Sequence, residues 1–168
     1  MRLAPALLVA LALAVVACSA DPPPGYRAAS AEERDALLRV VREYYDVFDR
    51  GQVTGDISPL YALHPRLAEG EDRRRGVNTE SWTVERARTL GAREVVVDVD
   101  SYEPARAYVK GDSAVVYVHG LFTWTYPNGS QTKGELPVRF DLDQQGGRWT
   151  IVRTDERVLG ETPEPTPR

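Results

Sequence analysis

The clearest pattern in the chain is a set of apolar residues that recurs at helical spacing between positions 37 and 48. Charged side chains fill the opposite face, which is typical of an amphipathic helix. Ser30 and Glu33 make a capping-box pattern at its start, and Gly51 is the expected stop. We therefore predict one helix about 30 Å long, at 1.5 Å per residue. Its apolar face consists of Leu37, Val40, Val41, Tyr44, Tyr45 and Phe48.

Two more helices are expected before the chain changes character. Residues 57–65 read as a short helix that ends at the pair His64 and Pro65, because the residue before a proline avoids the helical conformation. Residues 66–78 hold many charges and two glycines and are expected to form a loop. A second main helix is expected from Thr79 to Leu90, closed by Gly91, with Trp82, Ala87 and Leu90 turned inward.

The second half of the chain reads as strands joined by turns. Residues 93–102 alternate valines with acidic residues, and residues 105–110 follow as a separate short strand. Residues 113–126 are apolar on both faces, which is typical of a central strand. Asn128 and Gly129 form a strong hairpin signal, and two further strands are expected at 131–143 and 148–157. Helices followed by hairpin-linked strands indicate an α+β fold, with a long N-terminal helix and short helices packed on an antiparallel sheet.

The N-terminus has the features of an export signal. Arg2 is followed by an apolar run from Leu3 to Ala17, which is shorter than the roughly 20 residues that span a bilayer. The run ends in Val15-Val16-Ala17-Cys18, which resembles the bacterial lipobox. That resemblance implies cleavage before Cys18, lipid attachment to its sulfur and anchoring on the extracytoplasmic face of a cell membrane. An ordinary cleaved signal followed by a spare cysteine is the alternative.

These observations divide the chain into four parts. Residues 1–17 are the expected lipoprotein signal, and 18–29 the spacer beside the membrane. Residues 30–158 are the expected folded domain, and 159–168 a proline-rich tail. Cys18 is the only cysteine, which leaves no disulfide within the chain. The formal net charge is −4, and losing Arg2 makes it −5, so we expect no nucleic-acid partner.

The order of elements resembles the nuclear transport factor 2-like superfamily, also called SnoaL-like or cystatin-like α+β cone domains. The matching features are the helix 37–49, the turn segment 60–65, the hairpin 117–140 and the closing segment 147–152. The resemblance implies a curved sheet that wraps the long helix and leaves a pocket at the open end of the cone. The superfamily includes enzymes, small-molecule binders and dimerisation modules, so it also admits a homodimer formed through the sheet.

Six side chains are candidates for a ligand site in such a pocket. His64 is expected either at the pocket rim or as a partly solvated turn residue, and His119 either as a pocket base or as part of a packed sheet surface. The aromatic candidates are either cavity lining or plain core. The six are Tyr45, Tyr61, His64, Trp82, His119 and Trp124.

Two functions from different classes fit these features. The first is a non-catalytic domain, held at the membrane, that binds a small apolar ligand or an envelope protein. The second is a small acid/base enzyme of the isomerase, dehydratase or cyclase type, which by resemblance would use an Asp or His beside a Tyr. The sequence has no phosphate-binding loop, zinc-protease motif or nucleophile elbow. We therefore expect no metal and no cofactor, and we favour binding over catalysis.

The lipobox predicts acylation of Cys18. Intact-mass measurement of membrane-extracted protein should show a chain that begins at Cys18 and carries acyl groups. Cys18→Ala should release the protein or stall its processing, because the acyl chains are the expected anchor. Unacylated Cys18 in wild-type membranes would contradict the prediction.

Overall fold

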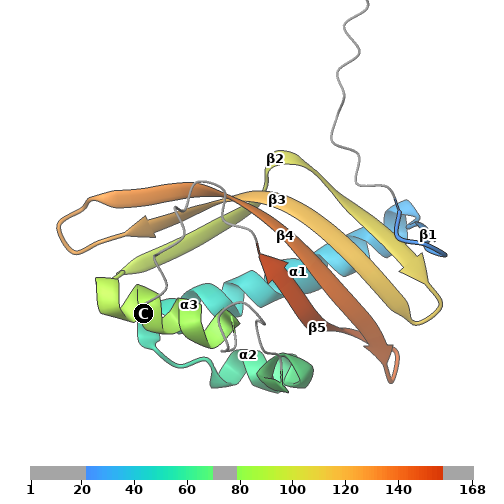
Figure 1. Ribbon diagram of the computed structural model, residues 1–168, viewed down its shortest axis with the longest axis horizontal. Helices are drawn as coiled ribbons and strands as arrows, with labels where there is room; N and C mark the ends of the chain where they lie inside the picture. The colour runs from blue at the N-terminus through green and yellow to red at the C-terminus, as the bar shows by residue number, and fades with distance from the viewer. Residues whose placement is uncertain (1–21, 70–78, 157–168) are drawn as a thin grey trace, which may run out of the picture.

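The computed structural model describes residues 22–69 and 79–156. The elements follow one another as β1 (Arg27–Ala28), α1 (Ala31–Thr54), α2 (Ser58–Leu63), the 3-10 helix η1 (Pro65–Glu69) and α3 (Thr79–Leu90). The strands β2 (Glu94–Lys110), β3 (Ser113–Thr125), β4 (Gln131–Gln145) and β5 (Arg148–Glu156) complete the fold. A curved sheet arches over α1 (Figure 1). The α+β class and the curved antiparallel sheet predicted from the sequence are confirmed.

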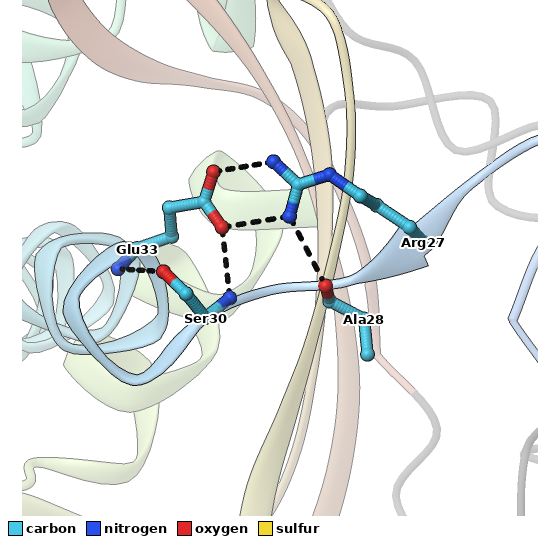
Figure 2. Close-up of polar contacts among 4 residues, drawn as sticks. All are labelled: Arg27, Ala28, Ser30 and Glu33. Atoms are coloured by element: carbon cyan, nitrogen blue, oxygen red, sulfur yellow. Dashed lines mark hydrogen bonds and ion pairs between the residues drawn. The ribbon is translucent and has the colours of Figure 1, made fainter.

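The start of α1 is fixed by the predicted capping box (Figure 2). The Glu33 backbone N–H donates to the Ser30 hydroxyl at 3.2 Å, and the Ser30 N–H donates to the Glu33 carboxylate at 2.8 Å. Arg27 adds two hydrogen bonds to the same carboxylate, at 2.6 and 2.9 Å. The Arg27 guanidinium, followed by the backbone of Ser30, lowers the pKa of Glu33 to about 2. The pair therefore ties β1 to the first turn of the helix.

The end of α1 differs from the prediction. The helix continues past Gly51 to Thr54, and Gly55 ends it in the left-handed conformation with φ 80°. Gly51 is a buried helical residue, and a Cβ on it would lie 3.1 Å from the carbonyl oxygen of Asp56. Its lack of a side chain lets the chain fold back closely after the helix. The same glycine resembles a helix stop in the sequence, because glycine commonly ends helices.

The short helices largely follow the sequence pattern. The predicted short helix is α2, which His64 caps, and α3 matches its predicted bounds. Residues 66–69, expected to be loop, belong with Pro65 to the 3-10 helix η1. Residues 70–78 lie outside the described residues. Of the residues expected to face inward from α3, Ala87 is buried, Trp82 is half-buried and Leu90 is exposed.

The sheet has the order β1-β2-β3-β4-β5, and every neighbouring pair is antiparallel. The two-residue strand β1 pairs Arg27 with Val109 and Ala28 with Tyr108. The end of the segment predicted as a spacer therefore belongs to the sheet. The two strands predicted at 93–102 and 105–110 form the single strand β2, because an irregularity replaces the break between them.

The bend of the sheet lies at that irregularity. Asp98 pairs with Leu121 and Glu103 with His119, so four residues of β2 stand opposite Gly120 alone. Such bulges bend a strand and increase its twist. A Cβ on Gly120 would lie 2.7 Å from the Asp98 carbonyl oxygen, so only glycine lets the two strands approach this closely.

The core lies between the apolar face of α1 and the concave face of the sheet. Leu37, Val41 and Tyr44 have no exposed surface, and neither have Val116 and Phe140 on the sheet. The α1 rings interlock with Phe140 in edge-to-face contacts, at 5.4 Å from Tyr44 and 5.8 Å from Tyr45 between ring centroids. These contacts fix both the height and the rotation of α1 beneath the sheet.

The close approach at Gly120 generates a stability prediction. Gly120→Ala should lower the free energy of unfolding by about 1–3 kcal/mol, as overpacking typically does, because its Cβ would meet rigid backbone. Urea denaturation measures the loss. Gly134→Ala is the matched control, since the three atoms nearest its Cβ would all belong to the Phe122 ring, a side chain that can rotate. An equal or smaller loss at Gly120 would contradict this account of the bend.

Candidate functional site

A cavity of about 200 Å³ lies at one end of the fold, between α1, α3 and the sheet. Six of its fifteen lining residues are aromatic, and large apolar rings with a few polar atoms are typical of small-molecule sites. The aromatic lining residues are Tyr45, Phe48, Trp82, Phe122, Trp124 and Tyr126. In Figure 1, α3 lies beside α1, under the part of the sheet where β3 ends.

Three of the six candidates from the sequence meet in this cavity. Tyr45 comes from α1, Trp82 from α3 and Trp124 from β3. Trp82 and Trp124 are both half-buried, and the Arg86 guanidinium lies 5.0 Å from the centre of the Trp82 ring. Tyr61 is not in the lining, because its hydroxyl is 2.7 Å from the Ser81 hydroxyl and bridges α2 to α3.

His119 lies on the outer face of the sheet, away from the cavity. Alternation along β3 places it opposite to Phe122 and Trp124, which face inward. Its ring stacks on Tyr102 with centroids 4.6 Å apart and planes 8° apart. Its Nε2 is 3.0 Å from Glu135, which also accepts a 2.6 Å hydrogen bond from the Tyr102 hydroxyl. His119 is thus part of a packed outer surface, which is the second of its two predicted roles.

His64 is buried inside the domain, at neither the rim nor the surface that the sequence suggested. It is 1% exposed, and its Nδ1 accepts a 3.2 Å hydrogen bond from the backbone N–H of Ile151 on β5. Burial, followed by the charge of Arg148, lowers the pKa of His64 to about 4. A neutral histidine that supports a strand backbone has a structural role.

A half-buried acid near the cavity, Asp49, was not predicted from the sequence. Asp49 accepts a 3.1 Å hydrogen bond from the backbone N–H of Val97 on β2 and a 3.3 Å bond from the side chain of Gln52. Burial raises the pKa of Asp49 to about 7, and the nearby Asp46 adds to the increase. Asp49 and Tyr45 both line a second, open groove between α1 and β2. Tyr45 lines the cavity as well.

A second acid, Glu80, lies deeper in the fold. It is 3% exposed and accepts hydrogen bonds from the hydroxyls of Thr154 at 2.6 Å and Tyr44 at 3.5 Å. Burial raises its pKa. The sequence feature that could have identified Asp49 as a site residue is its position on the helix one turn after Tyr45. No such feature identifies Glu80, because an acid in the first turn of a helix is ordinarily a favourable surface charge.

The described residues show neither a metal centre nor a helical membrane span. Within residues 22–69 and 79–156, no three His, Cys, Asp or Glu side chains gather as metal ligands would. None of the helices in these two segments combines the length and the apolar composition that a membrane crossing requires. Cys18 lies outside the described residues.

The arrangement of elements matches a known fold. A nuclear transport factor 2-like superfamily protein from Salmonella enterica serovar Typhimurium superposes with a TM-score of 0.52 and 15% identity, over 76% of this chain and 94% of that chain. The fold is that of the nuclear transport factor 2-like proteins. It confirms the cone predicted from the sequence. No protein-family model and no curated protein matches the sequence.

Two other solved structures also superpose on this chain. The association domain of CaMKII from C. elegans matches with a TM-score of 0.53 and 14% identity, over 74% of this chain and 95% of that one. A hexachlorocyclohexane dehydrochlorinase, LinA type 2, matches with a TM-score of 0.50 and 13% identity, over 82% and 95% of the two chains. At these identities the similarity establishes the fold, and function has to be argued from the site.

The buried histidine makes the stability of the domain depend on pH. Because the pKa of His64 falls from 6.5 to about 4 on folding, the unfolded chain binds a proton between these pH values that the folded chain does not. Its contribution to stability is therefore complete above pH 6.5 and is lost as the pH falls to 4, by about 3 kcal/mol.

His64→Asn is the matched variant, since its amide oxygen can accept from Ile151 but cannot titrate. Asp49 and Glu80 have raised pKa values and act in the opposite direction, so the measurement is the difference between the two proteins. Denaturation at pH 4 to 8 should show the wild type losing stability relative to His64→Asn below pH 6.5. Parallel pH curves would contradict the prediction.

Proposed function

We propose that this protein is a lipoprotein, anchored through Cys18 on the extracytoplasmic face of a cell membrane, whose cone domain binds a small apolar ligand without turnover. The observation that carries the binding role is the aromatic cavity, in which Tyr45, Trp82 and Trp124 line one space. Burying apolar surface against such walls is the main source of affinity for an apolar ligand.

The positions of the histidines favour binding over catalysis. Neither His64 nor His119 lines the cavity. His64 Nδ1 accepts a hydrogen bond from the Ile151 backbone. His119 stacks on Tyr102 and is hydrogen-bonded to Glu135 on the other face of the sheet. A general acid or base must be within hydrogen-bond reach of the reacting group, and neither ring satisfies this condition.

The anchor rests on the lipobox at Cys18 and agrees with the start of the fold. The chain already pairs with the sheet at Arg27, nine positions after Cys18. An acylated Cys18 would therefore hold the cone domain close to the membrane surface, where it would meet apolar molecules. An envelope protein as partner and a homodimer through the outer face of the sheet stay predictions, and the CaMKII association domain shows that the fold is found in assemblies.

The second candidate function is an acid/base enzyme, and one observation favours it. Asp49 has a pKa raised to about 7 and lines the groove between α1 and β2 beside Tyr45. A base is most effective when its pKa lies near the working pH. The dehydrochlorinase shows that the cone fold also supports catalysis.

Two variants separate the functions. Small molecules that copurify with the membrane-extracted protein are identified by mass spectrometry. Trp124→Ala should reduce their retention at least tenfold, because it removes a large apolar wall. His119→Ala, on the opposite face, is the control and should retain them.

For the enzyme reading, the protein and Asp49→Asn are tested for elimination and dehydration of small apolar substrates. Turnover by the wild type that falls by about a hundredfold in a folded Asp49→Asn variant would establish catalysis. Equal ligand retention in Trp124→Ala and His119→Ala would remove the cavity from the function.

A further inference from the structure

Two residues of the cavity wall each carry a buried polar atom without a hydrogen-bond partner. Among the described residues, three buried side-chain atoms have no hydrogen-bond partner: the Tyr45 hydroxyl, Gln52 Oε1 and His64 Nε2. Tyr45 and Gln52 both line the cavity, and each is only 3% exposed. Buried polar atoms in native proteins almost always have partners. Two exceptions on residues of one cavity wall are consistent with hydrogen bonds to a molecule bound there.

The orientation of the Gln52 amide is determined by Asp49. The Gln52 NH₂ group donates to one Asp49 oxygen at 3.3 Å, while the other oxygen accepts from the Val97 backbone. Above its pKa of about 7 the Asp49 carboxyl group is ionised and only accepts hydrogen bonds, so at pH 8 the amide nitrogen must face Asp49. The amide oxygen is then left as an acceptor, and its partner must carry an N–H or O–H group.

Tyr45 supplies the complementary group. Burial, followed by the charges of Glu156, Asp49 and Glu80, raises its pKa well above 10, so the phenol stays protonated and can donate. Tyr45 and Gln52 are seven residues apart on α1, about 10 Å along the helix axis, with Phe48 between them. The wall is therefore polar at both ends and apolar in the middle.

The described cavity lining carries one charge of each sign, on Arg86 and Glu156, so it favours neither an anion nor a cation throughout. Glu156 has the largest electrostatic effect on Tyr45 and would repel an anion beside its hydroxyl. Arg86 is the one cationic residue in the described lining. Its guanidinium lies over the Trp82 ring, so it would repel a cation at that position.

We propose that the ligand is an uncharged, mainly apolar molecule with a hydroxyl or amide group that donates to Gln52 Oε1, while the Tyr45 hydroxyl donates to a ligand oxygen. Neither wall atom is exposed to water in the structure, so binding requires small rotations of the Gln52 and Tyr45 side chains. This inference rests on the proposed function and specifies its ligand class.

Three probes with the same aromatic body test the polar group. Toluene, 4-methylphenol and 4-methylbenzoate are titrated at pH 8 into the full-length protein in lipid nanodiscs, with empty nanodiscs as the blank. The protein carries 5-fluorotryptophan, whose ¹⁹F signals report separately on Trp82 and Trp124 in the cavity and on Trp149 outside its lining. We expect 4-methylphenol to bind about fivefold more tightly than toluene, the effect of one net hydrogen bond, and 4-methylbenzoate to bind most weakly.

The assignment to Gln52 is tested by Gln52→Leu, with Gln144→Leu as the matched control on β4, where the amide donates to Gly147. Because Tyr45 and Gln52 lie about 10 Å apart along the helix, the single hydroxyl of 4-methylphenol can pair with only one of them. One of the two variants, Gln52→Leu or Tyr45→Phe, should therefore reduce the affinity for 4-methylphenol to that for toluene, and both should leave toluene unchanged. Tyr45→Phe removes only the unpaired hydroxyl, so it should fold normally, and Gln52→Met replaces Gln52→Leu if the latter does not fold.

The outcomes separate this inference from the proposed function. If no probe moves the Trp82 and Trp124 signals, the binding function itself fails. If the probes bind but toluene equals 4-methylphenol, or 4-methylbenzoate binds most tightly, the cavity binds ligands and this ligand class is wrong. Unchanged 4-methylphenol affinity in both Gln52→Leu and Tyr45→Phe would also overturn it.

Discussion

The structure depends on the packing of α1 against the concave face of the sheet. Tyr44 has no exposed surface, and its ring contacts those of Tyr45, Phe48 and Phe140 at centroid distances of 5.0, 5.3 and 5.4 Å. Interlocked rings resist both sliding and rotation of the helix, because either motion opens voids in a close-packed interior. The other features of the site follow from where this contact places the next two turns of α1.

The cavity exists because the core is filled along one part of α1 and open along the rest. Beyond Phe48, the helix faces α3 and the strand ends near the Phe122 and Trp124 rings, which leave about 200 Å³ unfilled. The bulge opposite Gly120 bends β2 over β3 beside this region. The curvature that lets the sheet enclose α1 therefore also provides the opening at its end.

Buried polar groups connect the core to this opening. Asp49 accepts from both Val97 and Gln52, so one carboxylate ties the edge of β2 to the cavity wall. His64 and Glu80 perform the corresponding task deeper in the fold, where they support β5 through Ile151 and Thr154. Such groups lower stability unless their hydrogen bonds are complete. Among the described residues, Tyr45, Gln52 and His64 each keep one unpaired buried atom, and of these three only Tyr45 and Gln52 line the cavity.

The sequence by itself determined the elements, because helix caps, turns and apolar periodicity are local properties of the chain. It predicted the helix that starts at Ser30, the helix Thr79–Leu90, the Asn128-Gly129 hairpin and the α+β class. Because side chains alternate along a strand, the positions of His119 and Trp124 within 113–126 are enough to put them on opposite faces. Tertiary structure decided which face is concave, and thereby that Trp124 lines the cavity while His119 lies outside. It likewise decided that the Asp49 carboxylate on α1 accepts from the Val97 backbone on β2, because only the packing of distant segments brings these atoms together.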